Sequence, residues 1–134
     1  MNAAGLRTAV SRAYYAVHHV ARAFVEEAGV RLKRSGEAHA DVWNHLANSG
    51  DVQIDRLGYT LSELHSNRID ADYLLHIRAV EDSNTAAALV TDARALVEII
   101  VKCRADRVRF ENVKKAIRTR HAVLRGLSTP DAPQ

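Results

Sequence analysis

Apolar residues recur at steps of three and four along most of the chain, a spacing typical of amphipathic α-helices. The first such stretch runs over about residues 3–28, and Gly29 supplies its stop. Its apolar stripe consists of Leu6, Val10, Ala13, Val17, Val20 and Phe24. The pattern predicts a long first helix with one face directed into a core.

Two more helices are predicted before residue 68. The shorter covers about residues 37–48, after a basic, glycine-bearing loop in which Ser35 can act as the N-cap, and it ends at Gly50. The longer covers about residues 52–67, although Gly58 weakens it by about 1 kcal/mol relative to alanine. One face of this helix carries Ile54, Leu57, Leu61 and Leu64.

The last third of the chain is also helical in its pattern. A helix begins at Ser83, with an apolar stripe of Leu89, Ala93, Leu96, Ile100 and Cys103. The basic segment over about 102–127 is amphipathic: Phe110, Val113, Ile117, Leu124 and Leu127 lie on one side, and Arg107, Lys114, Arg118, His121 and Arg125 on another. No glycine or proline marks a break near residues 104–107. Whether residues 84–127 form one helix or two is left open.

These elements predict an all-α fold, an up-and-down bundle of four to five helices. Both prolines fall in the last five residues, and no alternating strand pattern continues beyond residues 52–54. We expect one domain over residues 1–127 and a disordered tail over 128–134. No apolar run approaches the ~18 residues of a membrane span, and the first residues lack a signal-peptide layout, so we expect a cytoplasmic protein without membrane contact.

The charge of the chain is unevenly distributed. Residues 1–101 carry 10 basic and 13 acidic side chains, whereas residues 102–125 carry 9 basic and 2 acidic ones. A segment with a net charge of +7 can bind a polyanion such as RNA or an acidic partner protein, or it can form a helix face that only solvent contacts. The nucleic-acid-binding residues expected from this pattern are Arg107, Lys114, Arg118 and Arg125.

Seven histidines invite a comparison with metal and catalytic templates. None of the spacings matches His-Glu-x-x-His or a cysteine-histidine zinc pattern, so no metal site is expected. Glycine-rich phosphate loops and nucleophile elbows are absent as well, and no cofactor is expected. The single cysteine, Cys103, is predicted to be a buried free thiol.

Two segments concentrate polar and aromatic residues. In SRAYYAVHHVARAF, residues 11–24, Arg12 and His19 lie on one helix face about 10.5 Å apart, with Tyr15 between them. In LHSNRIDADYLLH, residues 64–76, an arginine follows the third helix and is surrounded by carboxylates, a tyrosine and histidines. Each segment also has a structural interpretation: an ion pair and core tyrosines in the first, and a capped loop with Asp70 or Asp72 in the second.

The two segments, in this order, resemble the prokaryotic HEPN superfamily. The similarity is closest to the branch with Ser-Arg-Ala-Tyr-Tyr-Ala-x-x-His in the first helix and Arg-x-x-Ala-Asp-Tyr later, and it covers roughly residues 5–103. It implies a four- or five-helix bundle, usually a homodimer, from toxin-antitoxin, defence or stress modules. Such proteins are often paired with a small nucleotidyltransferase.

Many members of this superfamily are metal-independent ribonucleases that use an arginine followed after four to six residues by a histidine. Here the slot five residues after Arg68 holds Tyr73, and the nearest histidines are His65 and His76. The resemblance therefore implies an RNA-targeting toxin or defence component in which Arg68 binds phosphate and His19 or His76 moves a proton. Arg12 and Asp72 would hold these groups in place, and Tyr73 would line the same cleft.

Two alternatives remain open at this point. A non-catalytic module of the same fold would bind a nucleotide or a partner enzyme such as a nucleotidyltransferase. A helical adaptor would use the polar clusters only for packing.

Homodimerisation is also expected from the first helix. Tyr14, Ala21 and Val25 widen its apolar arc beyond what one neighbouring helix covers.

Overall fold

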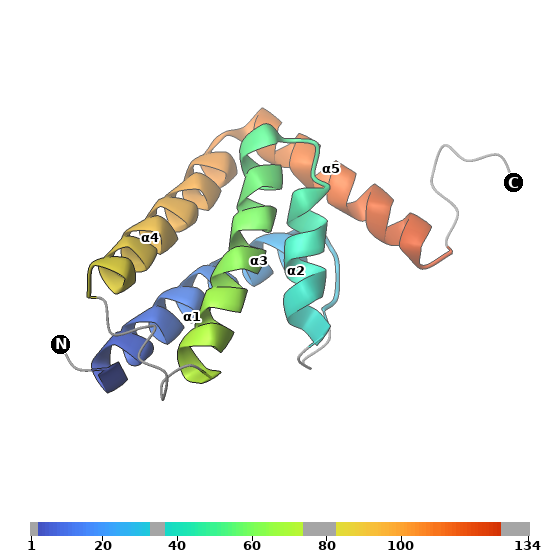
Figure 1. Cartoon of the computed structure of the whole chain (residues 1–134). Helices are drawn as coiled ribbons and strands as arrows, with labels where there is room; N and C mark the ends of the chain where they lie inside the picture. The colour runs from blue at the N-terminus through green and yellow to red at the C-terminus, as the bar shows by residue number, and fades with distance from the viewer. Residues whose placement is uncertain (1–2, 33–36, 74–82, 127–134) are drawn as a thin grey trace, which may run out of the picture.

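Five α-helices make up the part of the chain that the computed structural model describes, residues 3–32, 37–73 and 83–126 (Figure 1). They are α1 (Ala3–Glu27), α2 (Glu37–Ala47), α3 (Val52–Tyr73), α4 (Ser83–Ala105) and α5 (Arg107–Leu124). The described residues contain no strand, which confirms the all-α prediction. Within them, no helix combines the length and the hydrophobicity that a membrane span requires.

The third helix is longer than the apolar pattern indicates. It continues to Tyr73, so the arginine of the second polar segment lies inside α3 and does not follow it. The prediction of a helix end near residue 67 is therefore wrong. Residues 68–73 include several polar side chains, as a connector does, but none is glycine or proline, and helix propensity costs them little.

The fourth helix ends, and a separate helix begins, at Asp106. Its backbone is extended, with φ −92° and ψ 101°, and its side chain accepts a hydrogen bond of 3.1 Å from the backbone N–H of Arg109. An aspartate in this position is a favoured N-cap. Residues 84–127 thus contain a helix break, and α5 folds back over the bundle before extending beyond it (Figure 1).

Helix α1 is the centre of the bundle, because it packs against all four other helices. The predicted apolar stripes of α1, α3 and α4 are confirmed wherever their side chains are described: residues such as Val17, Leu61 and Ile100 are fully buried. Tyr14, Ala21 and Val25 are also fully buried inside this one chain. The other helices of the same chain therefore cover these widening residues of α1, and the wide apolar arc does not support the predicted dimer.

A charged contact fixes the start of α5 against the start of α3. The carboxylate of Asp51 caps α3 by accepting from the backbone N–H groups of Gln53 and Ile54. The Arg109 guanidinium donates two hydrogen bonds to the same carboxylate, at 2.6 and 3.0 Å. These bonds hold the pKa of Asp51 below its ordinary value. This paired contact joins the start of α5 to the start of α3.

Candidate functional site

Three helices bring imidazole rings together around one buried tyrosine. We call Tyr14, His18, His39 and His65 the histidine cluster; the first two belong to α1, and the others to α2 and α3. The rings of His18 and His39 stack with centroids 4.1 Å apart, and His39 lies 5.3 Å from His65. The Tyr14 ring is 5.2 Å from the ring of His65. Such a grouping offers several acid-base groups within one small volume.

His18 is the buried member of the cluster. Only 5% of its surface is exposed, and its Nδ1 atom has no hydrogen-bond partner among the described residues. Burial, followed by the neighbouring charge of His39, lowers the pKa of His18 to about 4. His18 is therefore neutral at physiological pH and can only support the rings that reach solvent.

Tyr14 orients the ring of His39. The Tyr14 hydroxyl and the Nδ1 atom of His39 are hydrogen-bonded partners. When the hydroxyl donates, Nδ1 carries no proton and Nε2 carries it, so the opposite side of the ring presents a donor. A second tyrosine, Tyr15, is 37% exposed beside the cluster, with its ring centroid 6.3 Å from His39.

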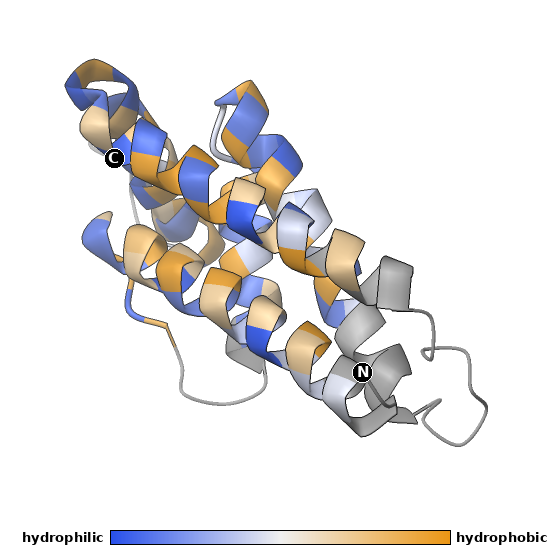
Figure 2. Cartoon of the chain, turned by 90° about the vertical axis from the view of Figure 1, so that its left-hand side faces the viewer, coloured by the Kyte–Doolittle hydropathy of each residue, from blue (hydrophilic) through white to orange (hydrophobic). Residues whose placement is uncertain are grey.

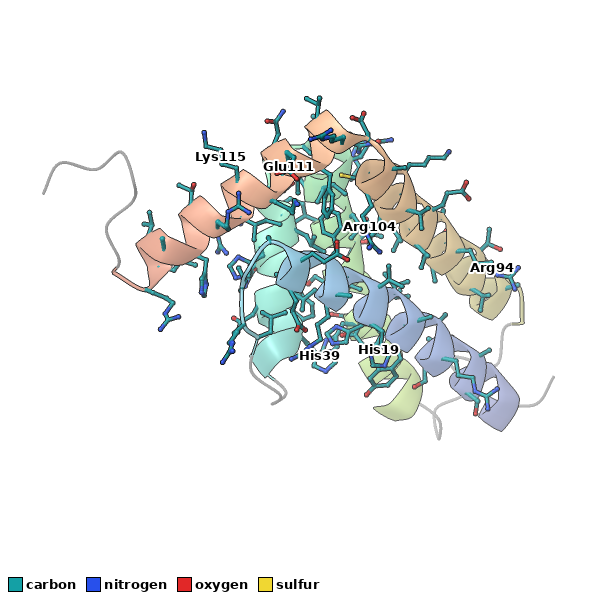
Figure 3. All side chains as sticks on the ribbon, turned by 180° about the vertical axis from the view of Figure 1, so that it is seen from behind. His19, His39, Arg94, Arg104, Glu111 and Lys115 are labelled. Carbon is teal, nitrogen blue, oxygen red and sulfur yellow. The ribbon has the colours of Figure 1, made fainter. Side chains whose placement is uncertain are left out.

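His19 forms the exposed edge of this arrangement. It is solvent-exposed, and its ring lies 6.2 Å from Tyr15 and 6.1 Å from His18. Figure 3 shows His19 and His39 on the same side of the bundle. Exposed aromatic and imidazole rings are suitable for stacking against unpaired bases.

The remaining predicted catalytic residues fall in three places. Arg68, Asp72 and Tyr73 occupy the last two turns of α3, three, seven and eight positions after His65. Arg12 is exposed on α1 and lines a groove toward α4. His76 lies outside the described residues.

His39 and His65 are site candidates that the sequence reasoning missed. They come from different helices, so no spacing along the chain connects them with His18. The only local signal is that His65 precedes Arg68 by one helical turn, which places the two positions on one face of α3. Within the described ranges, no group of three histidine, cysteine or acidic side chains has the geometry to hold a metal ion.

The basic helix α5 presents a second candidate surface. Arg107, Arg118 and Arg125 are exposed, as predicted. Lys114 does not face outward: its side chain is 19% exposed, lies 2.7 Å from Glu111 and covers the Phe110 ring at 4.5 Å. We define the basic face of α5 as Arg107, Arg118 and Arg125, which recur at steps of eleven and seven residues and therefore share one side of the helix.

The apolar side of α5 docks only in part. Val113 and Ile117 are buried and Phe110 is partly buried, as expected. Leu124 is 62% exposed, so its predicted docking is wrong, because the end of α5 extends beyond the bundle (Figure 1). Leu127 lies outside the described residues.

Two further titratable side chains, His45 and Cys103, are buried in the bundle. His45 of α2 is buried, and its Nδ1 lies 3.1 Å from Nη1 of Arg120. Burial and the Arg120 charge lower the pKa of His45 to about 4. Cys103 is a buried free thiol whose pKa is raised by burial, as the sequence predicted.

Comparison with known families gives one match. A family profile described as HEPN domain matches residues 1–104. The match includes α1 to α3 and nearly all of α4, and it ends before α5. No curated protein and no solved structure matches the chain.

Proposed function

Because the chain belongs to the HEPN domain family, which is generally associated with RNA-targeting and defence roles, we propose that it is a metal-independent endoribonuclease of a toxin or defence system. The observation that carries this proposal is the convergence of imidazoles from α1, α2 and α3 on one side of the bundle. Cleavage of RNA without a metal ion needs a base and an acid in close proximity, and two imidazoles can fill both roles.

The proposed reaction is attack by a ribose 2′-hydroxyl on the adjacent phosphorus. One imidazole takes the 2′-hydroxyl proton while the bond from phosphorus to the 5′-oxygen breaks, and a second imidazole protonates that oxygen. The products are a 2′,3′-cyclic phosphate and a 5′-hydroxyl. We assign the exposed His19 and the Tyr14-oriented His39 to these proton transfers, because His18 is buried and its pKa is about 4.

Arg68 is the proposed phosphate ligand. It follows His65 by one turn of α3, and a guanidinium can hold two phosphate oxygens at once. Asp72 and Tyr73 follow within the next two turns and are proposed to line the same site. His76 remains a proposed alternative proton donor.

The experiment is RNA cleavage by the purified full chain in EDTA. We expect cleavage that leaves 2′,3′-cyclic phosphate ends, and we expect Arg68→Ala and His39→Gln to reduce the rate by at least about 100-fold, the size typical for loss of an acid-base group. Arg56→Ala is the matched control, because Arg56 is an exposed arginine on the same helix. Loss of cleavage in EDTA, or full activity in Arg68→Ala, would contradict the proposal.

RNA binding by the basic face of α5 is tested through its salt dependence. Replacement of Arg107, Arg118 and Arg125 by glutamine should weaken binding of single-stranded RNA and flatten the log-log salt slope by about 2, because three phosphate contacts no longer release counterions. The melting temperature should hardly change, since all three side chains are exposed. The control is a triple glutamine variant of Arg31, Arg56 and Arg94, which removes the same charge elsewhere. Equal slopes in the two triple variants would show that the basic face is only solvated.

The stacked rings also favour a second candidate function, a non-catalytic nucleotide-binding or partner-binding module. His18 and His39 stack nearly parallel, with 16° between their planes, and the exposed Tyr15 lies beside them, which suits a bound base. A nucleotide-induced rise in melting temperature without any RNA cleavage would support this candidate. HEPN domains often form dimers, and we propose a homodimer for this chain on that ground. A nucleotidyltransferase is proposed as a partner from the family resemblance of the two motifs alone.

A further inference from the structure

A groove between α1 and α4 lies outside the site proposed for RNA cleavage. Figure 2 shows these two helices side by side on the face that it presents. The groove has a volume of about 480 Å³. Its lining consists of Ala9, Arg12, Ala13 and Ala16 on α1, and of Val90, Ala93, Arg94 and Val97 on α4.

The floor of this α1–α4 groove is apolar and consists of small side chains, alanine and valine. Ala13 and Ala93 are buried at the contact of the two helices, while Val90 and Val97 are partly buried on the α4 side. On each helix the lining spans eight residues, and the seven steps between the first and the last correspond to about 10.5 Å, or two turns. A groove of that length accepts apolar side chains that repeat at i, i+3, i+4 and i+7 on a partner helix.

Arg12 and Arg94 are the charged residues among those described in the groove lining, and both are positive. Arg12 and Arg94 are exposed and each directly adjoins a buried alanine, so one arginine stands at the outer edge of each helix. Neither has a carboxylate partner among the described residues, whereas Arg22, Arg104 and Arg109 each have one. Two unpaired guanidinium groups at the edges of an apolar floor are complementary to carboxylates that flank an apolar seam.

A second copy of the chain does not supply that complement from α1. The only acidic residues of α1 are Glu26 and Glu27, at its last turn and far from the groove. Helix α4 carries Asp92 and Glu98, but neither lines the groove. Two grooves packed face to face would therefore place the arginines of both copies on one surface, with like charges facing each other.

From the groove and its charge we infer that the α1–α4 groove is the docking site for an acidic amphipathic helix of a partner protein. The seam of that helix covers the alanine and valine floor, and its glutamate or aspartate residues pair with Arg12 on one edge and Arg94 on the other. No member of the histidine cluster lines this groove, so peptide docking is measured by anisotropy without RNA.

The test uses three fluorescein-labelled synthetic 18-residue helices and fluorescence anisotropy with the full chain. The first peptide has a leucine seam at i, i+3, i+4 and i+7 flanked by glutamates, the second has lysines in place of the glutamates, and the third has serines in place of the leucines. We expect the first peptide to bind about tenfold or more tightly than the other two. Equal binding by the serine peptide would overturn the inference, because charge alone would then explain the affinity.

Charge-reversal variants of the protein test whether the glutamate peptide binds in the α1–α4 groove. Arg12→Glu with Arg94→Glu should exchange the preference from the glutamate peptide to the lysine peptide. The matched control is Arg31→Glu with Arg56→Glu, which changes the net charge equally at exposed positions outside the groove and should leave the preference unchanged. Unchanged binding in the groove variant, or the same loss in the control, would overturn the inference.

Ala16→Trp provides a readout that does not depend on charge. Ala16 is exposed in the groove, so an indole there should fill it without disturbing the core and should abolish binding of the glutamate peptide. Light scattering on the same variant tests whether a second copy of the chain occupies the groove instead. Conversion of a dimer to a monomer by Ala16→Trp would show that a second copy fills the groove and would overturn the inference.

Discussion

Lowering the pH from 7.5 to 4.5 is expected to cost this protein several kcal/mol of folding stability, mainly through His18 and His45. Both side chains are 95% buried, and the pKa of each is lowered from 6.5 to about 4. A histidine whose pKa falls by that amount on folding contributes about 3 kcal/mol of pH-dependent stability.

The direction of this effect follows from proton binding. Between pH 6.5 and 4 the unfolded chain protonates both histidines, whereas the folded chain keeps them neutral. The free energy of unfolding is therefore highest above pH 6.5 and falls as the pH decreases toward 4. Asp51 has a lowered pKa, so its contribution is lost only at still lower pH, below the ordinary carboxylate value of 3.8.

The positive groups around each histidine explain why no compensation is expected. His18 faces His39, His19, Arg22 and His65, and its unpartnered Nδ1 has no acceptor for an added proton. His45 faces Arg120 and His121, and only the weaker influence of Asp41 opposes them.

Urea denaturation at a series of pH values measures this effect. His18→Gln and His45→Gln should each flatten the pH dependence between 6.5 and 4, and the double variant should lose most of it. Asn44→Ala is the control, because Asn44 is an exposed residue without a titratable group and precedes His45 in the same helix. A wild-type stability that stays constant from pH 7 to 4.5 would contradict the prediction.

Gly58→Ala is expected to destabilise the protein by more than about 3 kcal/mol, although alanine is the better helix former. A Cβ atom at position 58 would lie 2.5 Å from the backbone nitrogen of Ala47 and 2.6 Å from the backbone oxygen of Trp43. Both atoms belong to the backbone of α2, which cannot move aside as a flexible side chain does. Helices α2 and α3 would have to separate.

Ser62→Ala is the matched control for this variant. Ser62 lies one turn after Gly58 in α3 and is only partly buried, so its replacement should change the stability by less than about 1 kcal/mol. The separation of α2 from α3 should also disturb the contact of His39 with His65, which two-dimensional NMR of the imidazole protons can follow. Gly58→Ala with wild-type or higher stability would show that the close approach of the two helices is not required.

The sequence by itself determined the helical elements and their buried faces. A spacing of three and four residues is a local property, because one apolar side of a helix must meet a core wherever that core lies. The limits of α1, α2 and the start of α4 follow from the same local pattern with its glycine and serine signals. The family predicted from the resemblance is confirmed by the profile match over residues 1–104. The apolar pattern left the break at Asp106 open, although its cause is local, because the side chain of Asp106 caps the next helix.

Only the tertiary structure decided which helices approach one another and which side chains meet. Gly58 counts against a helix in the sequence, but in the fold it permits the backbone contact with α2. Lys114 shares a helical face with Arg107 and Arg118, yet it is drawn onto Phe110 and Glu111. His18, His39 and His65 stand 21 and 26 residues apart along the chain and meet through three helices. No spacing rule connects such positions, because their proximity depends on helix packing angles and loop paths that arise only when the whole core is assembled.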